Sequence, residues 1–382
     1  MNKYLELTMT HRVDIHGKKM MGWLAPLMLA LTLMVSSCSP ATEGQEGNDA
    51  WVTLTISTGG GAADGGEGMA SRASGSAADK DWQVNDLTIY IFDQTGQVIG
   101  SSYASYSINS KQDITATVKT RKAQNCTVIA LANAGTLSGT YATAQITSPF
   151  AGVSTLSEFQ QKYITFKDMA SLESAPCLLM VGYLKGFDTT STAKSSISLQ
   201  RLASRLDFTI TVNQDKDTGR PIVVDSYQLC HAPLSAFYAP ADMSSTGITL
   251  PSGTSFVEYA ANSTAFNSWT SGSNSQSYTA YVYANPATTA TDATYLLIKA
   301  HSQASNTDTR KIWQSEFKVY LTGITGLADY QLLPNYHYTI GITVQGSATE
   351  HNGVKTVYTA YPYYSSSLSP WGSNENRDLD MK

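Results

Sequence analysis

Apolar and polar residues alternate in one short segment after another along this 382-residue chain. In the first such segment, residues 51–57, Val52, Leu54 and Ile56 fall on one face and threonines fall on the other. Successive side chains of a β-strand point to opposite faces of a sheet, so this pattern indicates a half-buried strand. Similar segments recur as far as residue 361, separated by the Gly, Ser, Asn and Asp residues typical of turns. The sequence therefore predicts an all-β fold.

The remaining strands are predicted from the same pattern. A hairpin with a turn at Gly96 is expected over residues 84–99. Further strands are expected at residues 114–118, 126–132, 178–184, 196–212, 222–229, 277–284, 294–300, 312–321, 336–344 and 354–361. The dense turn signal at residues 213–221 predicts a boundary between two β-sandwiches in series, residues 81–213 and residues 214–382.

One short helix is predicted in the N-terminal domain. Thr155 and Glu158 have the spacing of a capping box, in which each side chain bonds the backbone of the other residue. Leu156, Phe159 and Tyr163 would then share one face of the helix.

The chain begins with the features of a secretion signal. Lys18 and Lys19 precede an apolar stretch, residues 20–35, which leads through two serines to Cys38. The stretch is short for a membrane span, and the alternative interpretation is a short anchor helix with Cys38 as an ordinary thiol. We interpret residues 1–37 as a bacterial lipoprotein signal peptide and Cys38 as the lipidated first residue of the mature chain.

Residues 38–80 combine a polar, acidic tether, the isolated strand at 51–57 and a linker rich in Gly, Ala and Ser. Such a linker favours a flexible connection that proteases reach easily. Arg72 is the only Arg or Lys between Lys19 and Lys80, and Ala73 follows it. An Arg-specific protease would find one site in this linker, between Arg72 and Ala73.

The sequence contains no recognisable catalytic or cofactor-binding constellation. The net charge of −5 comes without a long basic run, so we expect no nucleic-acid partner. The histidines after Cys38 are scattered, and the chain contains no nucleophile elbow and no phosphate loop. We therefore expect no enzyme activity, no metal and no cofactor.

Three smaller groups of residues have a structural interpretation. The acidic turn around Asp215 and Gly219 has a calcium-loop flavour, but the glycine comes one position late and no glutamate closes the loop, which favours a polar turn. The thiols after Cys38 are odd in number and lie in apolar surroundings, so we expect them buried and free; they are Cys126, Cys177 and Cys230. Arg201 and Arg205 are expected at a domain edge, paired with acids such as Asp207.

Three longer motifs carry a resemblance to a known family. They are Asp-Leu-Thr-Ile-Tyr-Ile-Phe-Asp-Gln-Thr-Gly at 86–96, Leu-Gln-Arg-Leu-Ala-Ser-Arg-Leu at 199–206 and Asn-Tyr-His-Tyr-Thr-Ile-Gly-Ile at 335–342. Together with the signal before Cys38, the early strand and the Arg-Ala pair in the linker, they make most of the mature chain similar to the FimA-type fimbrillins of Bacteroidales. That family includes major, minor and anchor subunits of surface pili.

The resemblance implies two transthyretin-like β-sandwich domains in tandem and a structural subunit of a cell-surface pilus that contributes to adhesion. In the family, an outer-surface Arg-specific protease removes the first strand, and a strand of a neighbouring subunit fills the empty groove. Carried onto this chain, Cys38 would bear the lipid, residues 51–57 would be the removable strand, and the cut would fall between Arg72 and Ala73.

The implied partners are other pilus subunits, the protease, a host or bacterial surface ligand, and the outer membrane through the lipid. By analogy the donor strand lies in residues 358–371, although Pro370 interrupts the pattern there because it cannot donate to a strand ladder. Two alternatives stay open. One is an uncleaved, lipidated anchor subunit, and the other is a surface lipoprotein that binds glycans through aromatic side chains such as Trp313 or Trp371.

Overall fold

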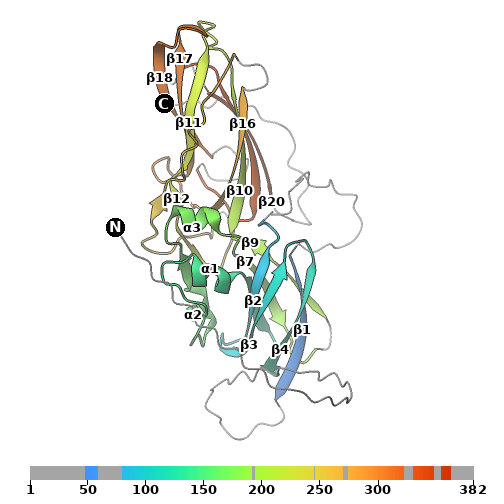
Figure 1. Ribbon diagram of the computed structural model, residues 1–382. Helices are drawn as coiled ribbons and strands as arrows, with labels where there is room; N and C mark the ends of the chain where they lie inside the picture. The colour runs from blue at the N-terminus through green and yellow to red at the C-terminus, as the bar shows by residue number, and fades with distance from the viewer. Residues whose placement is uncertain are drawn as a thin grey trace, which may run out of the picture. The chain divides into compact units, whose positions relative to one another are not determined.

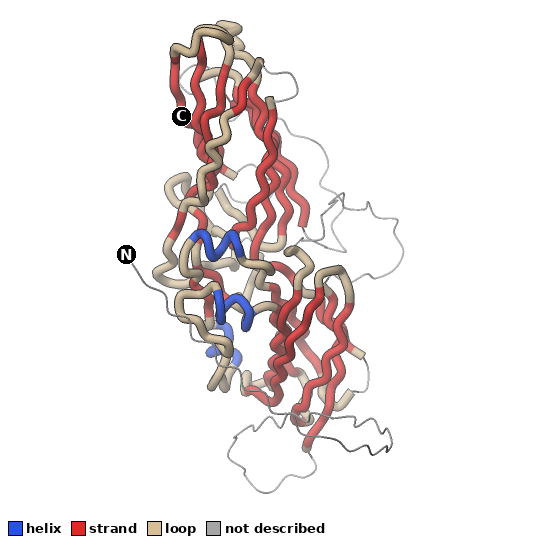
Figure 2. The backbone as a smooth tube through the Cα atoms, viewed as in Figure 1, coloured by secondary structure: helices blue, strands red, loops and turns tan. Residues whose placement is uncertain are grey.

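The structure is a computed structural model that describes residues 48–58, 80–191, 194–244, 246–269, 274–321, 330–347 and 354–362. Strands dominate these residues, and the all-β prediction is confirmed (Figures 1 and 2). Three short helices occur among them rather than the one predicted: α1 (Ala134–Thr140), α2 (Leu156–Gln160) and α3 (Met169–Ser174). Residues 46–382 form one compact unit.

The first sandwich is a single sheet folded onto itself, in the strand order β8-β1-β4-β3-β2-β5-β7-β9. The sheet folds where β3 and β4 share only the pair Gly100 and Thr120, at a glycine whose Cβ would lie 2.7 Å from the carbonyl oxygen of Lys119. Its strands are β1 (Asp49–Ser57), β2 (Val84–Phe92), β3 (Val98–Ile108), β4 (Asp113–Arg121), β5 (Cys126–Ala132), β7 (Met180–Phe187), β8 (Ser195–Ser198) and β9 (Gln200–Arg201).

The second sandwich consists of two separate sheets with the orders β16-β10-β19-β20 and β15-β11-β17-β18. Its strands are β10 (Ala203–Val212), β11 (Ile222–Cys230), β15 (Phe266–Asn267), β16 (Ser275–Tyr283), β17 (Tyr295–Gln303), β18 (Lys311–Tyr320), β19 (Tyr336–Val344) and β20 (Val354–Pro362). Two small strand pairs complete the structure, β6 (Tyr163–Thr165) with β13 (Ser235–Phe237) and β12 (Ala232–Pro233) with β14 (Phe256–Val257).

The two sandwiches repeat one strand topology. The order β4-β1-β8 in the first corresponds to β16-β10-β19 in the second, and β3-β2-β5-β7 corresponds to β15-β11-β17-β18. Both first strands are central: β1 runs antiparallel to β4 and parallel to β8, and β10 runs antiparallel to β16 and parallel to β19. Each sandwich therefore needs its own first strand to join two neighbours.

The predicted strand at residues 196–212 is divided among β8, β9 and β10, which belong to different sandwiches. Since β10 pairs with β16 and β19, the chain passes into the second sandwich at Leu202. This corrects the expected boundary between residues 213 and 214. The turn at residues 213–221 instead carries the chain from β10 to β11 in the opposite sheet of the same sandwich.

The capping box at α2 is confirmed. The Glu158 amide donates to Thr155 Oγ1 at 3.2 Å, and the Thr155 amide donates to Glu158 Oε2 at 3.2 Å. The helix stops at Gln160, however, so the prediction that Tyr163 shares its face is wrong; Tyr163 lies in β6 and is half exposed.

Helix α1 was missed because its Gly, Thr and Ser residues have low helix propensity. A buried carboxylate from outside the helix compensates. Asp86 accepts hydrogen bonds from the amides of Gly135 and Thr136, at 2.9 and 2.7 Å, and so satisfies two donors of the first turn. Tertiary contact, rather than local sequence, produces this helix.

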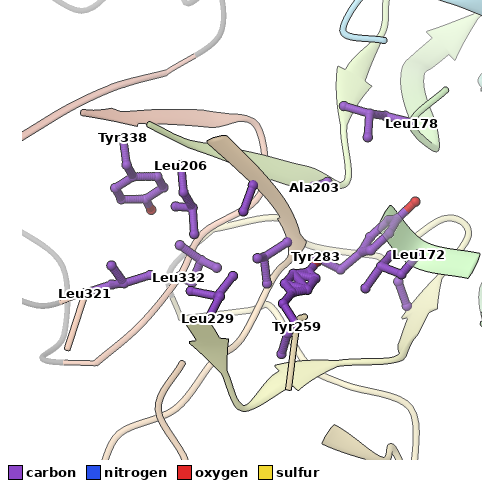
Figure 3. Packing of buried hydrophobic residues seen from close by; sticks show 14 of the residues in the cluster. Leu172, Leu178, Ala203, Leu206, Leu229, Tyr259, Tyr283, Leu321, Leu332 and Tyr338 are labelled. Atoms are coloured by element: carbon purple, nitrogen blue, oxygen red, sulfur yellow. The ribbon is translucent and has the colours of Figure 1, made fainter. Parts of the chain in front are cut away.

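One hydrophobic cluster continues from the first sandwich into the second. It includes Leu172 and Leu178 on one side and Leu206, Tyr283 and Tyr338 on the other, and Figure 3 shows these side chains packed at the junction. A separate cluster fills the interior of the first sandwich. The junction is therefore packed as a core of its own.

Replacing Gly182 by alanine is expected to destabilise the protein by about 1–3 kcal/mol, the usual cost of overpacking. A Cβ on this residue of β7 would lie 2.5 Å from the side chain of Ile197 and 2.6 Å from the Ser198 carbonyl oxygen, both in β8. Urea-induced unfolding measures the change. Gly139→Ala is the control, because its Cβ would meet only Thr147, at 3.2 Å or more; equal losses for both variants would contradict this explanation.

Candidate functional site: the first strand and its groove

Strand β1 is held along both of its edges. It pairs antiparallel with β4 from Asp49↔Arg121 to Ser57↔Asp113. On its other edge, residues 54–57 pair in parallel with residues 195–198 of β8. Without β1, facing backbone groups of β4 and β8 would lose their partners and a groove would separate the two strands.

The inward side chains of β1 form part of the core of the first sandwich. Val52, Leu54 and Ile56 are at most 3% exposed and belong to the cluster that includes Ile114 and Val118 of β4. Burial of each side chain stabilises by about 1.5–3 kcal/mol, so the three contribute roughly 5–9 kcal/mol as an upper estimate. The predicted strand is confirmed, and loss of β1 would expose an apolar groove.

The end of β1 and the start of the following segment are held by the same short stretch of chain. The Leu199 amide donates to the Ser57 carbonyl at 2.9 Å, and the Arg201 guanidinium donates to the Asp81 carbonyl at 2.8 and 2.5 Å. Two positions in this stretch thus anchor both ends of residues 59–79. That linker can span roughly 70 Å when extended, far more than the connection requires.

Several predicted functional residues lie outside the described residues. They are Cys38, Arg72 and Ala73, as well as the signal peptide at 1–37 and residues 363–371 of the expected donor segment. The described part of that segment belongs to β20, whose backbone pairs antiparallel with β19 from Tyr336↔Pro362 to Val344↔Val354.

Among the described residues, no three His, Cys, Asp or Glu side chains are grouped to hold a metal ion. Asp215 accepts the Trp313 indole N–H at 2.9 Å and the Thr218 amide at 2.9 Å, so it organises a turn. The indole N–H of Trp313, one of the aromatic residues considered for glycan binding, is thereby engaged within the fold. No helix in the described ranges is long and apolar enough to cross a membrane.

The three cysteines of the described chain are buried and unpaired with one another, as expected. Burial raises the pKa of the Cys177 thiol to about 12, with a further contribution from the nearby Asp86 carboxylate. A thiol with such a pKa stays protonated and unreactive at neutral pH. Cys126, Cys177 and Cys230 are therefore packing residues.

Arg201 and Arg205 lie at the change from the first sandwich to the second, as predicted. Arg205 bonds Asp207 Oδ1 at 3.0 Å and Asp81 Oδ2 at 3.3 Å. Asp207 also accepts Thr279 Oγ1 at 2.7 Å and His337 Nε2 at 2.6 Å. The sequence predicted the Arg205–Asp207 pair but gave no sign of Asp81, which is distant in sequence.

Comparisons with known proteins agree with this architecture. Residues 51–216 match the family model of the major fimbrial subunit protein (FimA). A putative cell adhesion protein from Parabacteroides distasonis has a similar structure, with a TM-score of 0.59 and 18% identity over 84% of this chain and 99% of that chain. A putative cell adhesion protein from Bacteroides eggerthii has a TM-score of 0.51 and 17% identity over 84% and 98% of the two chains.

The fimbrillin FimA from Porphyromonas gingivalis is similar with a TM-score of 0.51 and 11% identity, over 81% of this chain and 97% of that chain. No curated protein matches the chain in sequence. At these identities the structures show the fold alone, and they confirm the predicted all-β fold of tandem sandwiches.

Replacing Leu54 by alanine is expected to cost about 2–5 kcal/mol, because it leaves a cavity in the core of the first sandwich. Thr53→Ala, on the exposed face of the same strand, is expected to cost less than about 1 kcal/mol. The free energy of unfolding in urea measures both. Similar losses for the two variants would contradict the assignment of the buried face of β1.

Asp207→Asn is expected to lower the melting temperature at neutral pH. Burial alone would raise the pKa of Asp207, but hydrogen bonds from His337, Thr279 and Arg205 outweigh it and hold the pKa well below its usual range. A carboxylate with a depressed folded pKa stabilises the protein above its unfolded value of about 3.9, and this contribution is lost as pH falls through the folded pKa. The difference between wild type and variant should shrink below about pH 4; a difference that grows there would contradict the network.

Proposed function

Residues 51–216 of this chain belong to the family of major fimbrial subunit proteins (FimA), and from that premise we propose that the protein is a structural subunit of a cell-surface pilus assembled by strand exchange. The proposal rests on one observation above all. Strand β1 completes the first sandwich on both edges, yet it connects to β2 only through the linker at residues 59–79. A cut in that linker would leave β1 held by non-covalent contacts alone.

The processing steps follow from the sequence before and after β1. We propose that Cys38 is lipidated and carries the precursor to the outer membrane, and that an Arg-specific protease cuts between Arg72 and Ala73. The composition of the linker supports access for a protease, because Gly-, Ala- and Ser-rich chains are flexible. Both linker ends are anchored, so cutting it requires no opening of the sandwich.

The assembly step is the replacement of β1 by a strand of another subunit. The incoming strand would restore the backbone bonds of β4 and β8 and supply apolar residues at alternate positions in place of Val52, Leu54 and Ile56. Residues 358–371 are the proposed donor by analogy with the family. In the structure, the described part of this segment pairs along one edge only, with β19, whereas β1 pairs along two.

A second candidate function is an uncleaved, lipidated anchor subunit, which the complete pairing of β1 within its own chain also suits. A glycan-binding surface lipoprotein is less favoured, since the indole N–H of Trp313 is bonded to Asp215. Adhesion to a host or bacterial surface remains part of the proposal as the role of the assembled pilus.

Arg72→Ala is expected to abolish both the shortened subunit and the polymer in cells that make the wild-type pilus, because the linker contains no other Arg. Mass spectrometry of the N-terminus should find Ala73 in the wild-type polymer and a lipidated Cys38 in the variant. Arg220→Ala, in an exposed turn of the second sandwich, is the matched control. A polymer built from uncut, lipidated wild-type chains would support the anchor function instead.

A further inference from the structure

The three residues that follow the linker, Lys80, Asp81 and Trp82, are fixed by side chains from distant parts of the sequence. The most buried of these belongs to Arg201, whose side chain has no exposed surface. Its Nε and Nη2 donate to the Asp81 carbonyl at 2.8 and 2.5 Å, and its guanidinium lies 4.5 Å from the centre of the Trp82 ring. Hydrogen bonding and cation–π contact together hold both residues.

Lys80 is held separately. Its ammonium donates to the carbonyl oxygens of Glu173 and Ala175, at 3.2 and 3.4 Å, and lies 4.6 Å from the centre of the Tyr281 ring. Burial lowers the pKa of this ammonium, although nearby Asp81, Cys177 and Glu173 act in the opposite direction. The lysine side chain therefore points into the protein, against α3 and β16.

Arg205 adds a third contact, from its Nη1 to Asp81 Oδ2 at 3.3 Å. We call the contacts of Arg201, Arg205 and Tyr281 with residues 80–82 the clamp. Its members come from β9, β10 and β16, none of which pairs with β1. The clamp consequently does not require β1 to be present.

We infer that the clamp makes residues 80–82 a proteolytic stop, which ends the removal of N-terminal residues before β2 begins at Val84. A protease must draw several residues into its active site in extended form, so a segment held by tertiary contacts is cut only after it opens locally. For a protease that cuts after basic residues, the linker offers Arg72, and the next basic residue, Lys80, is shielded.

The consequence rests on the proposed function. If the chain is cut at Arg72, the remaining linker residues are expendable, whereas a cut after Lys80 would separate them from a start point of β2 that the clamp holds. By stopping degradation at residue 80, the clamp preserves β2, which lies between β3 and β5 in the first sandwich. The processed subunit thus keeps an intact groove wall and junction.

The test uses the full chain carrying Arg72→Lys and a lysine-specific endoprotease, with mass spectrometry following the products that begin at residues 73 and 81. A free peptide of residues 74–88 gives the intrinsic rate of cutting after Lys80. In the protein, cutting after Lys80 is expected to be at least about 100-fold slower than in the peptide, because it needs local opening. A rate within about threefold of the peptide overturns the inference.

Arg201→Met in the same background should speed cutting after Lys80 by at least about tenfold and leave cutting after position 72 unchanged. Should this variant fail to fold, Tyr281→Ala removes the ring beside Lys80 instead. Arg310→Met is the matched control, because Arg310 is 81% exposed and bonds only the nearby Asp308 among the printed sequence neighbours of its loop. Unchanged cutting in both clamp variants would overturn the role of the clamp.

The two proposals fail in different ways in this experiment. Resistance to cutting after position 72 contradicts the accessible linker of the proposed function, whatever happens at Lys80. Rapid cutting after Lys80 contradicts the clamp, whatever happens at position 72.

Discussion

The first sandwich depends on β1, the strand that joins β4 to β8 and supplies three buried aliphatic side chains to the core between the layers. Its counterpart in the second sandwich, β10, makes the same pairings but follows β9 after the single residue Leu202. That short connection ties β10 to the fold, whereas β1 has a long linker on the side of β2. The same topology is therefore used twice, with a separable first strand in one copy only.

The junction between the sandwiches explains how β1 can be separable without loosening the rest of the protein. One hydrophobic cluster passes through the junction, and Arg201 and Arg205 bind the chain just after the linker. Removing β1 would take away contacts with β4 and β8, but none of the contacts of residues 80–82 named above. The effect of losing the strand is thus confined to one groove.

Periodicity predicted most strands because each sandwich buries one face of each strand, as at β5 and β19, whose predicted bounds are those observed. It failed where the third dimension decides. Residues 196–212 alternate almost without interruption, and nothing local shows that they pass from one sandwich to the next at Leu202. Helix α1 needs the carboxylate of Asp86, and the contact of Arg201 with Asp81 joins residues 120 positions apart. The early strand at Val52, Leu54 and Ile56 was predictable, but its central place between β4 and β8 was not.

Strand exchange into the cut chain tests the central claim most directly. The linker is cut at an introduced site for a sequence-specific protease, and a labelled peptide of residues 48–58 is added in excess. The account predicts that one labelled peptide per chain replaces β1, and that a peptide with Leu54→Asp does not, because an unpaired carboxylate would be buried in the groove. If the cut chain stays folded yet takes up no labelled peptide, or takes up both peptides equally, β1 is not an exchangeable strand.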